Sequence, residues 1–147
     1  MRRNLTIAAA AMALALGCAG TAFAATTVTV KLEDSTVDPS IKGMPMVVDR
    51  TSVPAGEVDF DVTNLSKALV HEMLIFPAPP AGQALPYDDA AQKVKEAEGH
   101  KLEETDDMAP GLHKTVKITL EPGDYLLICN QPGHYKMGMW SKFTVTK

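Results

Sequence analysis

The chain has 147 residues, of which 46% are hydrophobic, and its 14 lysine and arginine residues face 18 aspartate and glutamate residues. The resulting formal charge of −4 disfavours nucleic acid as a partner, because binding to phosphate backbones depends on clustered positive charge. The length is suited to one domain with a single hydrophobic core.

The N-terminus carries the three parts of a secretory signal peptide. Arg2 and Arg3 precede an apolar run over residues 5–16, and the small-residue triplet Ala-Phe-Ala follows at residues 22–24. We therefore expect cleavage before Ala25 and export to the periplasm or beyond. The apolar run is shorter than the roughly 20 residues of a membrane-spanning helix, and no later stretch is longer, so we expect no transmembrane segment in the mature chain.

Two alternatives concern this export. Cys18 is a candidate for lipidation, although residues 15–17 match a leucine-led lipobox poorly, and Arg2-Arg3 allows a twin-arginine route. Removal of residues 1–24 leaves 123 residues with 12 basic and 18 acidic side chains, a formal charge of −6. We expect residues 25–147 to form one monomeric domain, and the acidic balance favours basic partners.

Seven short segments alternate between apolar and polar residues, the pattern of strands that are buried on one face. Pro-Gly turns occur at residues 53–56 and 121–124, and Tyr125 suits the tyrosine corner of Greek-key sandwiches. We predict an all-β Greek-key β-sandwich of two packed antiparallel sheets. The expected strands are residues 27–32, 46–49, 56–64, 70–76, 115–120, 124–129 and 140–146.

Residues 77–110 interrupt this pattern, and we interpret them as an inserted surface segment. Within it, residues 86–98 predict a short helix, because Pro86 suits the first helical position, acidic residues follow in the first turn, and Gly99 provides a stop. The charged residues 101–107 are typical of a solvated face.

Cleavage leaves Cys129 without a second cysteine in a compartment where cysteines usually pair. It could be a buried inert thiol, a nucleophile or a metal ligand. Residues 129–139 read Cys-Asn-Gln-Pro-Gly-His-Tyr-Lys-Met-Gly-Met, which places the Cys129 thiol, the His134 imidazole and the Met139 thioether on one loop. Soft sulfur with imidazole selects copper, and two histidines, one cysteine and a weak axial methionine make an electron-transfer site.

Such a site needs a second histidine from another strand. His71 lies within the apolar segment 70–76, whereas His100 and His113 lie in polar stretches. We therefore choose His71 as the fourth ligand, and the alternative is a core histidine with a satisfied hydrogen bond.

These motifs make residues 25–147 resemble the cupredoxin family, the plastocyanin, azurin and pseudoazurin group of type 1 blue copper proteins. The likeness is strongest over residues 125–139, because cupredoxins carry Cys, His and Met on the loop between their last two strands. The family's upstream histidine maps onto His71. The resemblance implies a cupredoxin-like sandwich with one copper per chain, acting as a one-electron carrier between redox partner proteins.

Two details remain open within the resemblance. Met137 and Met139 both follow the loop histidine, and the His-x4-Met spacing of the plastocyanin and pseudoazurin type selects Met139 as the axial ligand. Many cupredoxins carry Asn or Ser directly after the first histidine, where this chain has Glu72. We therefore expect Asn64 or Asn130 to orient a ligand instead.

Other functions compete with the electron carrier. A periplasmic protein for copper storage, delivery or resistance could use the same residues, although the packing expected from Pro132 and Gly133 favours a carrier. Zinc is a third option, but a structural zinc site requires four strong ligands. A nucleophile and base formed by Cys129 and His134 would have no use for Met139, so we predict no enzymatic activity.

Overall fold

The computed structural model describes residues 24–147. Most of the predicted signal peptide, including Arg2, Arg3 and Cys18, lies outside the described residues. Residues 24–147 contain eleven strands and one short helix. The strands of the first sheet, in spatial order, are β2 (Met46–Val48), β1 (Thr26–Leu32), β4 (Gly56–Asn64) and β9 (His113–Leu120).

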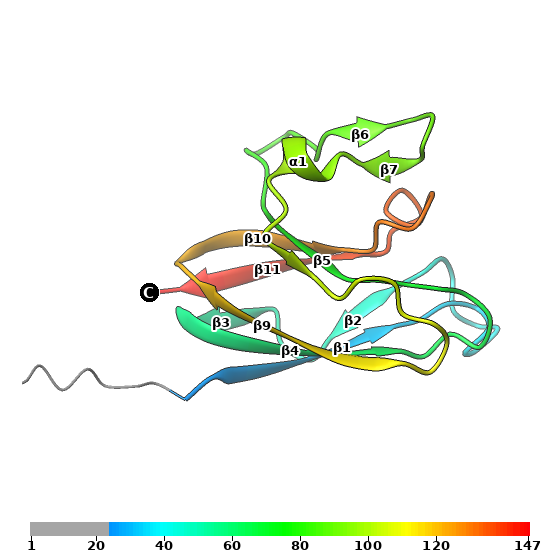
Figure 1. Ribbon diagram of the computed structural model, residues 1–147, viewed down its shortest axis with the longest axis horizontal. Helices are drawn as coiled ribbons and strands as arrows, with labels where there is room; N and C mark the ends of the chain where they lie inside the picture. The colour runs from blue at the N-terminus through cyan, green and yellow to red at the C-terminus, as the bar shows by residue number, and fades with distance from the viewer. Residues whose placement is uncertain (1–23) are drawn as a thin grey trace, which may run out of the picture.

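The second sheet packs against the first to form a β-sandwich (Figure 1). Its strands, in spatial order, are β3 (Ser52–Pro54), β11 (Trp140–Thr146), β10 (Gly123–Ile128), β5 (Leu74–Pro77) and β8 (Glu103–Glu104). The predicted β-sandwich is confirmed, and each predicted strand segment overlaps an observed strand, although within segment 70–76 the strand begins only at Leu74. No helix within residues 24–147 is long and apolar enough to cross a membrane.

The expectation of purely antiparallel sheets is wrong, because each sheet is mixed. β1 pairs with β4 in parallel, and β11 pairs with β3 in parallel. The reason is a crossing of the chain between the sheets: it leaves β1 through the antiparallel β2, enters the second sheet as β3, and returns to the first sheet as β4 beside β1.

The main core lies between the two sheets. Val58, Phe60 and Val62 of β4 are fully buried and alternate with more exposed residues, as period-2 patterning predicts. Phe60 packs edge-on against Phe143 of β11, with 5.2 Å between ring centroids. At the turn before β10, the Tyr125 hydroxyl donates to the backbone carbonyl of Glu121 (2.7 Å), in agreement with the predicted tyrosine corner.

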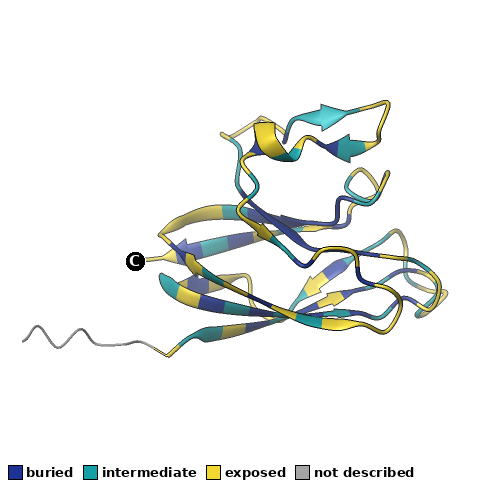
Figure 2. Ribbon diagram, in the orientation of Figure 1, coloured by how far each residue is buried: buried dark blue, intermediate teal, exposed yellow. Residues whose placement is uncertain are grey.

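β5 and the second half of β10 (residues 126–128) differ from this pattern because both of their faces are buried. In β5 and the residue before it, Met73 and Ile75 face the main core, while Leu74 and Phe76 face a second apolar cluster on the outside of the sheet. In Figure 2, buried residues lie along β5 and the second half of β10, beneath the segment that covers them, whereas the first residues of β10 are exposed. The expectation that every strand has one polar face is therefore wrong here, because residues 77–110 shield the outer face.

This covering segment contains a short helix, as predicted, but the predicted bounds, residues 86–98, are wrong. β6 (Tyr87–Asp88) and β7 (Lys93–Val94) form a small hairpin, and α1 (Glu96–Gly99) is a single turn. The Asp88 carboxylate accepts hydrogen bonds from the backbone amides of Ala90 (2.9 Å) and Ala91 (3.0 Å). Aspartate at this position stabilises a turn that competes with the helix.

Two other expectations for the segment have mixed outcomes. The predicted stop at Gly99 is confirmed, because α1 ends there and His100 takes a left-handed backbone conformation (φ 59°). A side chain at residue 99 would meet the Phe76 ring at 2.9 Å, so glycine allows the close contact with the sheet. The charged residues 101–107 are not simply a solvated face, since β8 pairs with β5 and extends the second sheet.

Candidate metal centre

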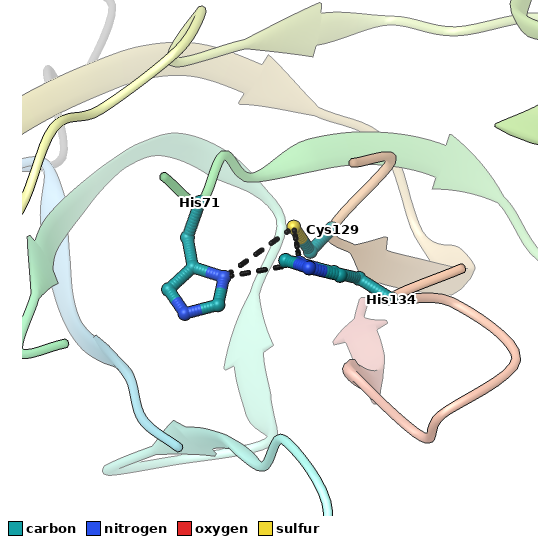
Figure 3. Close-up of side chains that lie close together, drawn as sticks. All are labelled: His71, Cys129 and His134. Carbon is teal, nitrogen blue, oxygen red and sulfur yellow. Dashed lines mark hydrogen bonds between the residues drawn. The ribbon is translucent and has the colours of Figure 1, made fainter. Parts of the chain in front are cut away.

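Three predicted ligands meet at one end of the sandwich. His71 lies just before β5, and a β-bridge with Met108 fixes its backbone. Cys129 follows β10 directly, and His134 lies in the loop that connects β10 to β11. Because Leu74 of β5 pairs with Ile128 of β10, both strands bring their ligands to the same end (Figure 3).

The spacing of the ligand atoms fits a single metal ion. His71 Nδ1 and His134 Nδ1 are 3.1 Å apart, and Cys129 Sγ lies 3.4 Å from His134 Nδ1 and 3.9 Å from His71 Nδ1. Bonds of about 2.0–2.1 Å to nitrogen and 2.3 Å to sulfur, as in zinc sites with these ligands, would place the three atoms about 3.5–3.8 Å apart around a trigonal ion. The observed triangle is within a few tenths of an ångström of this size.

Burial determines the protonation state of the Cys129 thiol. Cys129 is fully buried, and burial raises the pKa of its thiol to about 12, although backbone amides of Gln131 and Glu72 donate to the sulfur and oppose this shift. The metal-free protein therefore carries a protonated Cys129, and metal binding must release this proton.

The two histidines are available as neutral ligands. Burial lowers the pKa of His71, although Asp34 opposes this shift through a hydrogen bond and its charge. Burial and the neighbouring His71 ring lower the pKa of His134. His71 is fully buried and His134 half-buried, so the imidazole of His134 is the ligand nearer to solvent.

Asp34 contacts His71 directly, which the sequence did not predict. Its Oδ2 lies 3.0 Å from His71 Nε2, on the side of the ring opposite Nδ1. The other carboxylate oxygen accepts the Thr36 backbone amide at 2.7 Å, and Ser66 also bonds to the carboxylate. Burial alone would raise the pKa of Asp34, but the hydrogen bonds from Ser66, Thr36 and His71 lower it well below its usual value.

The two candidate axial methionines differ sharply in environment. Met139 is fully buried in the main core, and its carbonyl accepts the backbone amide of Cys129 at 2.9 Å. The side chain of Met137 is 53% exposed. These positions are consistent with an axial role for Met139 and with a place for Met137 on the molecular surface beside the loop.

Asn64 braces the approach to His71. Its side-chain amide donates to the carbonyls of Leu69 (2.9 Å) and Met108 (2.8 Å), and its oxygen accepts the Ser66 amide (2.9 Å). The Met108 carbonyl also accepts the backbone amide of His71 (3.2 Å). Asn64 therefore holds the loop before this ligand and the segment that pairs with it, as proposed from the sequence, but it does not contact the ring.

Asn130 braces the ligand loop against the covering segment. Its oxygen accepts the Val94 amide (2.6 Å), and its amide donates to the Val94 carbonyl (3.0 Å) and to the Glu96 carboxylate (3.1 Å). Gly133, with φ of 83°, donates its amide to the Gln92 carbonyl (2.9 Å). Residues 77–110 thus support the loop as well as covering the sheet.

Glu72 lies where many cupredoxins carry a polar neutral residue. It is buried, and its Oε1 has no hydrogen-bond partner among the described residues. Burial raises the pKa of Glu72 to about 7, with Lys93 opposing and nearby carboxylates adding to the shift. Its backbone amide faces the Cys129 sulfur, but its side chain supplies no hydrogen-bonded brace.

The other histidines lie away from these ligands. His100 ends α1 and is exposed, and His113 lies in β9 beside Asp61, also exposed. Within residues 24–147, the group of potential metal ligands with suitably close atoms is His71, Cys129 and His134. A mixed β-sandwich with this buried group at one end is a cupredoxin with a type 1 copper site.

Comparisons with known proteins agree with this class. A scan against protein-family models matches residues 20–146 to the copper binding proteins of the plastocyanin/azurin family. The chain therefore belongs to that family and binds copper. A search of curated proteins found no match.

Solved structures share the fold at low sequence identity. The chain is similar to reduced auracyanin from Roseiflexus castenholzii, with 23% identity, coverage of 85% of this chain and 100% of that chain, and a TM-score of 0.57. It is also similar to auracyanin A, a blue copper protein from Chloroflexus aurantiacus (19% identity, coverage 84% and 100%, TM-score 0.58). Rusticyanin from Thiobacillus ferrooxidans matches at 21% identity, coverage 84% and 80%, and a TM-score of 0.56.

Proposed function

We propose that this protein is an exported one-electron carrier whose copper is bound by His71, Cys129, His134 and Met139. The observation that carries the proposal is the triangle of ligand atoms from His71, Cys129 and His134. Met139 is buried, and its backbone is hydrogen-bonded to Cys129 and His134. When bound, copper supplies a couple between Cu(I) and Cu(II). The chain's own residues fix the ligand positions and control access to them.

Each ligand has a separate role in this proposal. The Cys129 thiolate is the strong sulfur donor and gives the site its colour. His71 anchors the site in the interior, and the half-buried His134 offers the shortest route between ligand and surface. Met139 supplies a weak thioether donor from the core.

The proposed partner is a redox protein with a basic surface. Residues 77–110 carry eight acidic side chains and three lysines, and they contact the ligand loop through Gln92, Val94 and Asp107. The excess of acidic over basic side chains in this segment would attract a basic partner and make electron exchange sensitive to salt. Export after cleavage before Ala25, a single domain from residue 25, a monomeric state and a role without catalysis are parts of the same proposal.

The test is addition of Cu(II) to the purified protein. An intense blue thiolate band with one copper per chain is expected, and Cys129→Ser should abolish it. A protein that stays colourless and retains zinc would contradict the proposal.

Paired methionine variants test the axial ligand. Met139→Leu should keep the blue band and raise the reduction potential, because loss of a donor disfavours Cu(II), whereas Met137→Leu should change the potential little. A shift confined to Met137→Leu would reverse the assignment. Copper storage or delivery is the competing function, and ready transfer of copper to an acceptor with slow electron exchange would favour it.

A further inference from the structure

The carboxylate of Asp34 contacts the His71 ring on the side that faces away from the other two ligands. Of the two ring nitrogens, Nδ1 faces Cys129 and His134, while Nε2 faces the buried carboxylate of Asp34 at 3.0 Å. Asp34 is 2% exposed and His71 is fully buried, so water does not replace this contact. A charge-assisted hydrogen bond in such a setting is strong and directional.

We propose that Asp34 is a positioning residue that fixes the tautomer of His71 and lowers the reduction potential of the copper site. The inference rests on the proposed ligation of copper by His71. A carboxylate accepts but does not donate, so it requires the proton of His71 to be on Nε2. The lone pair of Nδ1 is then directed toward Cys129 and His134, where the metal fits.

The carboxylate itself is held in place by other segments. One oxygen accepts the Thr36 amide (2.7 Å), and the Ser66 hydroxyl, which bonds to the carboxylate, also accepts the backbone amide of Leu69 (2.8 Å). The turn after β1 and the loop before His71 therefore meet at Asp34. Because these contacts fix the carboxylate, the orientation of the His71 ring is set before metal binds.

Both oxygens of Asp34 are used as acceptors, which explains why the charge matters. An amide at this position has one acceptor oxygen, so its NH2 group would face either the Thr36 amide or His71 Nε2–H. The carboxylate also makes the imidazole a stronger donor and adds negative charge near the site. Both effects stabilise Cu(II) more than Cu(I), because Cu(II) carries the larger positive charge.

The first test needs no variant and no copper. In the metal-free wild-type protein, nitrogen and proton NMR of the His71 ring should show the proton on Nε2, in slow exchange with water. A proton on Nδ1 would overturn the inference. This result is independent of the proposed function, which fails instead if the wild-type protein never develops the blue band.

The second test compares Asp34→Asn with Asp124→Asn. Asp124 bonds to the Thr144 hydroxyl and lies five residues before Cys129, about 16 Å away along an extended strand, so its variant removes the same charge far from the metal. Asp34→Asn should weaken Cu(II) binding about 10- to 100-fold and raise the potential, by about 59 mV for each tenfold loss of Cu(II) over Cu(I) affinity. Equal potentials in the two variants would overturn the proposed role.

Discussion

Substitution of Asn64 by alanine tests whether the hydrogen bonds before His71 hold the site. The side chain is fully buried and makes three hydrogen bonds, to Leu69, Met108 and Ser66. After the change, the Met108 carbonyl keeps its bond from the His71 amide, but the Leu69 carbonyl and the Ser66 amide lose their Asn64 partner. Two backbone groups would then be left without this partner inside the protein.

The expected cost follows from these two groups. A buried polar group that loses its partner costs about 1–3 kcal/mol. This cost applies to the Ser66 amide, while the partly buried Leu69 carbonyl costs less, so Asn64→Ala should lower the free energy of unfolding by about 1–4 kcal/mol. This is a large part of the roughly 5–15 kcal/mol that holds a typical domain. Because the Met108 carbonyl also bonds to His71, the loop should loosen around the ligand, and copper affinity should fall as well.

Urea unfolding of the metal-free protein gives the stability change, and copper titration gives the effect on the site. Asn130→Ala is the matched control: Asn130 is equally buried and makes three hydrogen bonds, but to Val94 and Glu96 of the covering segment. Asn130→Ala should lower the free energy of unfolding by a similar amount, while the NMR signals of the His71 ring should stay unchanged. A loss of less than about 1 kcal/mol for Asn64→Ala would refute the bracing role.

Two further predictions concern buried titratable groups in the metal-free protein. Burial raises the pKa of Glu72 from 4.5 to about 7, so the folded state binds its proton more tightly than the unfolded chain and loses stability as pH rises through this range. Glu72→Gln should therefore raise the unfolding free energy by up to about 3 kcal/mol near pH 8 and have little effect near pH 4. An equal effect at both pH values would contradict this account. With a thiol pKa of about 12, about one Cys129 side chain in 10,000 is a thiolate near pH 8. Iodoacetamide should therefore modify Cys129 slowly until urea unfolds the chain. Rapid alkylation of the folded protein would disprove its burial.

The grouping of His71, Cys129 and His134 was predictable because two of its members lie on one short loop. The spacing from Cys129 to His134 is fixed by local sequence, and the apolar segment around His71 marked the remaining partner. Strands such as β4 were equally predictable, since alternation of Val58, Phe60 and Val62 directly reflects the two faces of a strand.

The contact of Asp34 with His71 could not be predicted in the same way. The two residues are 37 positions apart, and residues 33–36 look like an ordinary polar turn. The usable signal was an acidic residue two positions after a buried strand, which is too common to indicate a ligand partner. The predicted bounds of the helix, residues 86–98, were wrong for a related reason. Asp88, expected in the first helical turn, stabilises a non-helical turn instead, and only Glu96–Gly99 before the predicted stop form a helical turn.

The same long-range contacts bear on the choice between carrying electrons and delivering copper. Asp34 and Asn64 hold the His71 side of the site, and Asn130 ties the ligand loop to the covering segment. These contacts hold the elements that carry the ligand atoms, which lie near metal-binding distances. A site fixed in this way changes little between oxidation states, which favours rapid electron transfer, whereas release of copper would require these braces to open. Removal of one of these hydrogen-bonded contacts should consequently shift the protein toward copper exchange. Asn64→Ala should loosen the loop before His71. In this variant, copper transfer to an acceptor should accelerate and electron exchange should slow.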